Sequence, residues 1–297
     1  MKNKRKLTPW LYSMPALILI GMVIVFPIIY TGYISLTNMN LFHWSNYEFI
    51  GLSNYSRALL KADSGFLGAL FTTLLWTTLN MVIQVVVAYF IALGFQREDL
   101  KGKRVYKTLL MFPWAMPAYV SILLWRVGIY NTEFGLLNKI LVALGFGKVN
   151  FLSTNVPAFL SGMTLNLWMA LPFMIMMIDG ALSSIDRSYY ESAELDGAGF
   201  WSKNIRITVP AMKGIIAPAV IMTTFTTFKQ FDIVYLLTMQ KGAYSGATLQ
   251  TVITYAQQNA FVSNNYGLSS AVSIIIFFLI MVFSLFTNRG VKEENYD

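Results

Sequence analysis

The sequence predicts an all-α membrane protein with six transmembrane helices, and two observations predict this fold class. Hydrophobic residues make up 56% of the chain and charged residues 12%, against roughly 25% charged residues in soluble domains. The apolar residues gather in long runs, and a helix needs about 20 such residues to cross a bilayer. We therefore expect lipid, rather than water, to surround most of the chain.

The predicted spans follow one another along a single transmembrane domain that covers residues 1–297. Their approximate bounds are 10–36, 70–95, 105–130, 156–182, 214–239 and 267–287. The first run follows a group of basic residues, but it is too long for a typical signal-peptide core and lacks a small-residue cleavage site, so we interpret it as a retained span. Prolines lie inside several spans and are expected to bend them.

The distribution of basic residues predicts the orientation of the spans. If the N-terminus faces the cytoplasm, fifteen Lys and Arg residues flank the spans on the cytoplasmic side and five on the outer side. An excess of Lys and Arg in cytoplasmic loops is the general rule, so we expect both termini to be cytoplasmic. The same clustering beside apolar runs accounts for the net charge of +8 without a nucleic-acid partner.

Reactive residue types are scarce. The chain has no cysteine and one histidine, His43, so disulfides and cysteine nucleophiles are excluded and no metal site is expected. No Gly-x4-Gly-Lys-Ser/Thr loop is present, so the chain is not expected to bind ATP itself. This composition argues against a membrane-embedded enzyme.

A polar loop, residues 183–213, separates the fourth and fifth spans. Ser188 and Glu191 have the spacing of a capping box, which predicts a helix over about 185–196. Gly197 is placed to end this helix in a left-handed conformation, and Pro210 is expected to limit the next helical stretch. Two interpretations remain open: an interfacial linker between spans, or a helix that grips a cytoplasmic partner.

The polar loop resembles the "EAA" loop of the membrane subunits of binding-protein-dependent ABC importers. The matching positions are Glu191, Ser192, Ala193, Gly197, Ile207, Val209 and Pro210, with Ser192 in place of Ala and Val209 in place of Leu. The resemblance covers roughly residues 10–290 and is closest to the MalF-type subunit of oligosaccharide importers. It implies a type I permease fold with a cytoplasmic coupling helix. The residues implied in ATPase coupling are Glu191, Ser192, Ala193, Asp196, Gly197, Ile207 and Pro210.

The resemblance also implies partners and a task. A second homologous permease, two ATPase subunits and an extracytoplasmic solute-binding protein would complete the importer in a bacterial or archaeal cytoplasmic membrane. This chain would bind no cofactor and catalyse no reaction, because Mg-ATP is bound by the ATPase subunits. The implied solute is an oligosaccharide, maltodextrin-like or related, carried by alternating access. A secondary transporter and an ABC permease for a non-sugar solute remain the alternatives.

Polar and aromatic residues in the spans suggest a solute path. Asn166, Met169, Ala170 and Phe173 have the i, i+3, i+4, i+7 spacing of one helix face. The fifth span offers further amide and hydroxyl groups, and the resemblance adds two positions of the third span; these are Thr226, Thr227, Gln230, Ala118 and Tyr119. The alternative interpretation is that Asn166 and Gln230 only hold helices together by hydrogen bonds.

Several ionisable residues lie within or at the ends of the predicted spans, and four of them carry expectations. Lys229 and Asp232, at i and i+3, are expected to form an intramembrane ion pair, because an unpaired charge at this depth is costly. Direct contact between Lys229 and the sugar is the alternative. Arg126 is expected to extend to the membrane interface, and Asp179 is expected to have a structural role.

Overall fold

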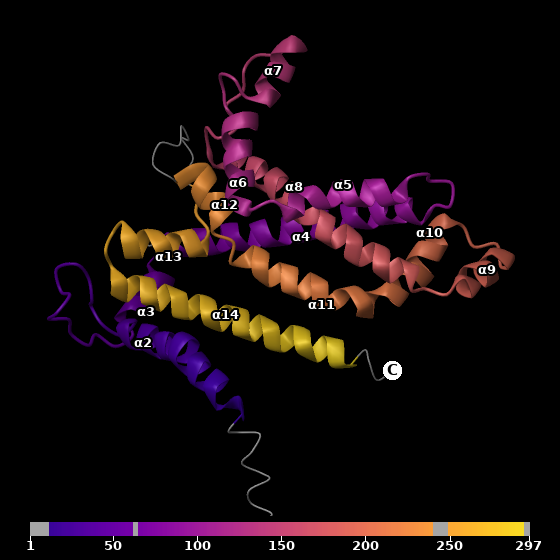
Figure 1. The fold of residues 1–297 in the computed structure, drawn as a ribbon. Helices are drawn as coiled ribbons and strands as arrows, with labels where there is room; N and C mark the ends of the chain where they lie inside the picture. The colour runs from indigo at the N-terminus through magenta and orange to yellow at the C-terminus, as the bar shows by residue number, and fades with distance from the viewer. Residues whose placement is uncertain (1–11, 62–64, 240–248, 294–297) are drawn as a thin grey trace, which may run out of the picture. The chain divides into compact units, whose positions relative to one another are not determined.

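The computed structural model describes residues 12–61, 65–239 and 249–293, and in this part the regular secondary structure consists of helices joined by loops (Figure 1). Within these ranges the only β feature is an isolated bridge between Thr37 and Phe49, so the all-α prediction is confirmed. The predicted start of the first span at Trp10 and part of the predicted third outer loop lie outside the described residues. The chain divides into two compact units, Met1–Ala69 with Val252–Val282 (unit 1) and Leu70–Thr251 with Phe283–Asp297 (unit 2).

Unit 1 contains the helical stretch Tyr12–Ile34, α3 (Ser53–Leu60), α13 (Val252–Phe261) and the start of α14 (Tyr266–Glu293). Its loops are held by buried Asn54, whose amide donates to the carbonyls of Ser35 (3.0 Å) and Thr37 (2.8 Å). Gly267 packs against the same loop, and a Cβ there would lie 2.3 Å from the Thr37 carbonyl oxygen, so only glycine fits. Most apolar side chains of Tyr12–Ile34 are exposed.

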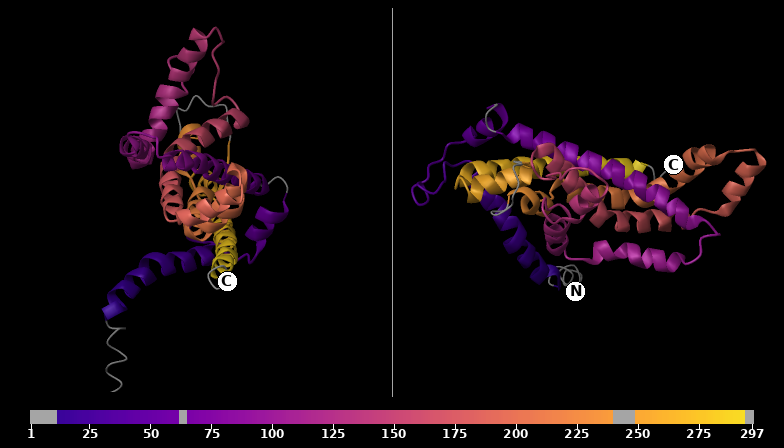
Figure 2. Two further views of the ribbon diagram at one scale, coloured as in Figure 1. Left: turned by 90° about the vertical axis from the view of Figure 1, so that its right-hand side faces the viewer. Right: turned by 90° about the horizontal axis from the view of Figure 1, so that it is seen from above.

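Unit 2 carries the remaining helices. In chain order these are α4 (Phe66–Gln96, whose first turn belongs to unit 1), α5 (Lys103–Ala115), α6 (Ala118–Leu123), η3 (Leu124–Ile129), α7 (Leu136–Ala143), α8 (Asn155–Ser183), α9 (Arg187–Leu195), α10 (Phe200–Lys203), η4 (Asn204–Thr208), α11 (Val209–Phe228), α12 (Asp232–Val234) and η5 (Tyr235–Met239). Helix α8 is central, since both α5 and α11 pack against it. Figures 1 and 2 show α9 and α10 at one end of this unit, and α7 away from that end.

The interior of unit 2 is formed by two apolar clusters. One cluster joins α4, α6, α8 and α12, and its members include Trp76, Ile122, Leu165, Ile233 and Leu237. The other lies nearer to α9 and joins α4, α8 and α11, with Phe95, Met174, Ile178, Leu182 and Met212. Gly162 allows the first cluster to close, because a Cβ at this position would lie 3.0 Å from the Trp76 ring.

Five helical stretches are long and apolar enough to cross a membrane: Tyr12–Ile34, Phe66–Gln96, Asn155–Ser183, Phe200–Thr238 and Tyr266–Leu285. They correspond to five of the six predicted spans. The stretch at Phe200–Thr238 begins earlier than the predicted start at residue 214, because Pro210 occupies an early position of α11, where its missing amide hydrogen is not needed. The prediction that Pro210 interrupts the helix was therefore wrong.

The predicted third span is not one straight helix. Lys103–Ala115 and Ala118–Ile129 are bent by 90° at the residues between them. Met116 adopts an extended conformation with ψ of 141°, as the steric demand of the following Pro117 favours. By contrast, Pro113, Pro172 and Pro218 lie inside continuous helices.

Candidate functional site

The polar loop after α8 folds into helix α9, as the sequence predicts, but with a different N-terminal cap. Asp186 is the capping residue, and its carboxylate accepts a hydrogen bond of 2.9 Å from the Ser188 amide. The expected capping box of Ser188 and Glu191 is not formed, because the helix begins at Arg187 and both residues already lie inside it. The start of the helix is thus fixed by one side chain.

The C-terminal end of α9 has the predicted glycine stop. Gly197 has a φ of +73°, in the left-handed region that favours glycine. The amide of Ala198 donates to the carbonyl of Ala193 (2.8 Å) and that of Gly197 to the carbonyl of Glu194 (3.0 Å), which is the Schellman arrangement. This local motif turns the chain sharply from α9 toward α10.

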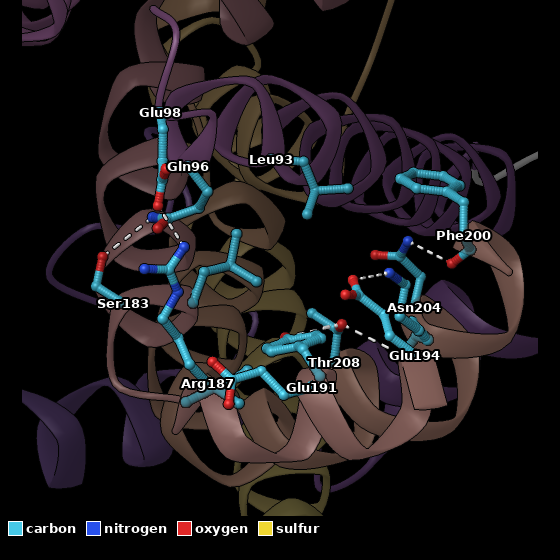
Figure 3. Close-up of a pocket in the computed structure, with 14 residues that line it drawn as sticks. Leu93, Gln96, Glu98, Ser183, Arg187, Glu191, Glu194, Phe200, Asn204 and Thr208 are labelled. Carbon is cyan, nitrogen blue, oxygen red and sulfur yellow. Dashed lines mark hydrogen bonds and ion pairs between the residues drawn. The ribbon is translucent and has the colours of Figure 1, made fainter. Parts of the chain in front are cut away.

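Helix α9 has two chemically different faces. Arg187, Tyr190, Glu191 and Glu194 line a cavity of about 820 Å³ between α9 and the ends of α4 and α8 (Figure 3). On the outer face, Tyr189 is 63% exposed and Leu195 is 91% exposed. A single exposed apolar side chain is common on protein surfaces, so the exposure of Leu195 identifies a free face of α9 but not its partner.

Polar contacts fix the walls of this cavity. Lys203 Nζ lies 2.7 Å from Glu194 Oε1, and the Tyr190 hydroxyl lies 3.0 Å from that of Thr208. Arg187 pairs with Glu98 of the loop that follows α4, but both side chains are more than three-quarters exposed, so this ion pair contributes little. Figure 3 shows Glu98, Arg187, Glu194 and Thr208 lying around the cavity.

The charges of the loop are set by these contacts. The hydrogen bond from Lys203 lowers the pKa of Glu194, and the bond from the Ser188 amide lowers the pKa of Asp186. The hydrogen bond to Glu98 raises the pKa of Arg187. All three groups are therefore charged at neutral pH.

The other residues predicted for coupling lie close to α9 in sequence but differ in exposure. Ser192 and Asp196 are exposed on the helix, and Ala193 is half-buried. Ile207 lies half-buried in η4, and Pro210 is exposed at the start of α11. The structure thus places the predicted coupling residues on α9 with its C-terminal turn and on the first part of the apolar stretch Phe200–Thr238, while their role in coupling stays a prediction.

Two of the residues predicted for the solute path form a network with two that the sequence analysis missed. We call Trp76, Asn80, Asn166 and Gln230 the amide network. Gln230 accepts from the Trp76 indole (3.3 Å) and donates to Asn166 (3.0 Å); Asn166 donates to Asn80 (2.8 Å), which donates to the Trp76 carbonyl (2.8 Å). Asn166 is only 4% exposed. In this conformation the network therefore joins α4, α8 and the segment after α11.

The remaining path residues lie on several surfaces. Met169, Ala170 and Phe173 are half-buried on α8, and the Phe173 ring stacks on that of Trp114, with centroids 6.1 Å apart. Tyr119 is exposed and Ala118 is half-buried at the start of α6. Thr226 is exposed whereas Thr227 is buried, so these two neighbours face different surroundings. The structure brings Asn166 and Gln230 together, but not the whole predicted set.

The expected ion pair between Lys229 and Asp232 is not formed. Helix α11 ends at Phe228 and α12 begins at Asp232, so the helical i, i+3 geometry on which the prediction depended does not exist. No salt bridge joins these two described residues, and Lys229 is exposed. The guanidinium of Arg126 donates to the Leu236 carbonyl at 2.9 Å, and its position at the membrane interface stays a prediction.

Asp179 is the centre of a second polar group, which we call the Asp179 cluster: Gln96, Lys107, Asp179 and Ser183. Lys107 Nζ lies 2.5 Å from Asp179 Oδ2, and the Gln96 amide donates to Oδ1 (2.9 Å) and to the Ser183 hydroxyl (3.0 Å). In the sequence, Lys107 contributed only to the predicted orientation. The signal that could have identified this pair is a carboxylate near the end of one apolar run and a lysine at the start of another. Among the described residues, no group of three or more His, Asp or Glu side chains could hold a metal ion.

Comparison with known proteins places this geometry in context. The sequence pattern of the family described as "Binding-protein-dependent transport system inner membrane component" matches residues 84–290. The trehalose/maltose transport system permease protein MalF of Thermococcus litoralis is 31% identical over 285 residues, which cover 96% of this chain and 94% of that protein. The galactooligosaccharides transport system permease protein GanP of Bacillus subtilis is 28% identical over 296 residues, or 96% of this chain and 70% of that protein.

Solved structures agree on the fold. A chain of a bacterial ABC transporter involved in the import of the acidic polysaccharide alginate superimposes with a TM-score of 0.81, covers 99% of both chains and has 22% sequence identity. At this identity the likeness concerns the fold alone. It agrees with the predicted permease fold of type I importers.

Proposed function

The chain belongs to the family of binding-protein-dependent transport system inner membrane components, and from this premise we propose that it is the MalF-type permease subunit of an ATP-driven oligosaccharide importer. The structural observation that carries the proposal is helix α9. It follows α8 in the chain and lies at one end of unit 2, with Leu195 on its outer face. A helix that only linked two spans would instead rest Leu195 in the membrane interface, and the variants below distinguish these two outcomes.

The end of unit 2 that carries α9 is proposed to face the cytoplasm. Arg97, Lys101, Lys103, Arg104 and Arg187 all lie at this end, and such an excess of basic residues is typical of cytoplasmic loops. This orientation presents α9 to soluble ATPase subunits and places both chain termini in the cytoplasm. The α7 region would then face the outside, where an extracytoplasmic solute-binding protein would deliver the solute.

Helix α9 is proposed to dock into an ATPase subunit through Tyr189, Ser192, Leu195 and Asp196. The opposite face, with Glu191 and Glu194, stays with the permease and lines the cavity. Because Gly197 has no side chain and its neighbourhood is open, the partner can approach the end of the helix closely. ATP hydrolysis then belongs to the partner subunits, and this chain converts their movement into a change of access.

The proposed solute is an oligosaccharide, because the relatives are named as trehalose/maltose and galactooligosaccharide permeases and because the chemistry of the path suits a sugar. The stacked rings of Trp114 and Phe173 offer a flat apolar face to a sugar ring, and Asn166 and Gln230 can hydrogen-bond hydroxyl groups. In this conformation the two amides hydrogen-bond to each other and to Asn80 and Trp76. Sugar passage would exchange these bonds for bonds to hydroxyls, and a second homologous permease would supply the other side of the path.

The test is reconstitution of this chain with its second permease, ATPase and binding protein in liposomes. We expect Leu195→Asp and Gly197→Asp to insert normally but to lose ATPase association and ATP-dependent sugar uptake by about tenfold or more. The reason is that either carboxylate places an unpaired charge in a dry contact, which is strongly unfavourable, and a loss of about 1.4 kcal/mol already weakens binding tenfold. Association is measured by co-purification and uptake with labelled sugar.

The matched control is Leu195→Met, which keeps an apolar side chain of similar volume and should retain association and uptake. Normal uptake by Leu195→Asp would refute docking through the outer face of α9. Uptake by this chain alone, without ATP, would favour a secondary transporter, and ATP-dependent uptake of a solute other than a sugar would favour a different importer class.

A further inference from the structure

The Asp179 cluster lies at the ends of three spanning helices. One carboxylate oxygen of Asp179 is bound by Gln96 at the end of α4, and the other by Lys107 in the second turn of α5. The backbone carbonyl of Asp179 accepts a further bond of 2.8 Å from Ser183 in the last turn of α8. Lys107 also lies over the Phe95 ring, at 5.5 Å from its centroid.

Burial distinguishes this cluster from the ion pairs of the polar loops. The Asp179 side chain is 7% exposed and that of Lys107 is 29% exposed, whereas both members of the pair Arg97–Asp99 are about 70% exposed. A buried ion pair is weak evidence for stability, because well-packed apolar residues often stabilise as much. The Asp179 cluster instead specifies one arrangement of the three helices. Its charged groups and its amide meet their partners only when α4, α5 and α8 keep the same register.

The cluster is close to the start of α9 along the chain. Helix α8 ends at Ser183 and α9 begins at Arg187, so three residues separate them. The one apolar residue among them, Ile185, packs against the cluster of apolar side chains that contains Phe95 and Ile178. Ile185 therefore ties the start of α9 to the end of α8, and the Asp179 cluster ties the end of α8 to α4 and α5.

We infer that Asp179, held between Lys107 and Gln96, is a positioning residue that makes the ends of α4, α5 and α8 move as one body with α9. The inference rests on the proposed function, because it assigns the route by which docking at α9 reaches the solute path. Helix α5 leads from Lys107 to Trp114, and α8 leads from Asp179 back to Phe173 and Asn166. The route connects the docking helix to these path residues through one buried contact.

The experiment measures sugar molecules transported per ATP hydrolysed by the reconstituted importer. Asp179→Asn and Lys107→Met should each assemble and hydrolyse ATP but lower this ratio by about fivefold or more, the lower end of the coupling between distant sites. Lys107→Arg keeps the charge and should keep the ratio. The double variant that exchanges the two charges, Asp179→Lys with Lys107→Asp, should recover most of it.

The control is Asp99→Asn, which removes the carboxylate of an exposed ion pair in the neighbouring loop and should leave the ratio unchanged. Single variants that reduce only the amount of assembled complex, with an unchanged ratio, would overturn the inference, as would a ratio lost equally in Lys107→Arg. If the wild-type importer showed no ATP-driven sugar uptake, the proposed function itself would fail; a coupled wild type with unaffected single variants would refute this inference alone.

Discussion

The amide network and the Asp179 cluster both join α4 to α8, but they do so with different chemistry at different places. The amide network is neutral, with Trp76, Asn80 and Asn166 buried and Gln230 half-buried, and it borders the apolar cluster to which Trp76 belongs. The Asp179 cluster contains a full ion pair and lies near the helix ends, where Lys107 keeps partial exposure. The difference follows from desolvation, because a hydrogen-bonded amide costs little at depth whereas a charge is tolerated only when it is paired or near water.

Breaking a contact in the amide network and breaking one in the Asp179 cluster should lower the stability of the protein by different amounts. Interhelical hydrogen bonds between neutral groups in membrane proteins contribute about 0.6 kcal/mol each on average. Removing one partner of a buried ion pair costs about 3–5 kcal/mol, because the remaining charge is left unpaired. The two regions should therefore respond to equivalent substitutions with clearly separated magnitudes.

The largest effect is expected for Asp179→Leu. The substitution leaves the Lys107 ammonium without its partner, so the free energy of unfolding should fall by about 3 kcal/mol, the low end of the range because Lys107 is partly exposed. Thermal unfolding of the purified protein in detergent measures the loss. A second substitution, Lys107→Met, should restore much of the stability by removing the unpaired charge, and its failure to do so would contradict the ion-pair explanation.

An intermediate effect is expected for Asn166→Leu. This substitution removes two hydrogen bonds of the amide network, to Asn80 and to Gln230, so the free energy of unfolding should fall by about 1–2 kcal/mol. The same variant separates the two interpretations of the network when assembly and uptake are measured together. Impaired uptake with intact assembly supports a place in the solute path, whereas loss of assembly with the same melting shift supports a purely structural role.

The smallest effect is expected for Gln84→Leu, a neutral contact near the amide network. The Gln84 amide donates to the Ala170 carbonyl at 3.0 Å, but its own buried carbonyl oxygen has no hydrogen-bond partner. The substitution loses one bond and removes one unsatisfied acceptor, so the change in stability should stay within about 1 kcal/mol. A loss as large as that of Asp179→Leu would contradict the separation of magnitudes between neutral and charged contacts.

Local features of the fold and of the candidate site were readable from the sequence. The long apolar runs correspond to spanning helices, and the glycine stop of α9 forms at Gly197 as predicted. The predicted N-cap was wrong by two residues. Asp186 is also a strong capping residue, and it caps the helix two positions before Ser188. The outer face of α9 was missed, although Tyr189 and Leu195 are apolar residues of a polar helix and could have been noted.

The sequence by itself determined the elements that depend on neighbours along the chain: the lengths of the apolar runs, the polar helix between two of them and the turn at its end. The tertiary structure decided which polar residues meet, because Lys107 and Asp179 are 72 residues apart and Asn80 and Asn166 are 86 apart. It also separated Lys229 from Asp232, which helical spacing had paired, because α11 ends at Phe228 and α12 begins only at Asp232. Periodicity fixes a face only while a helix continues, and the partner across that face is chosen by packing.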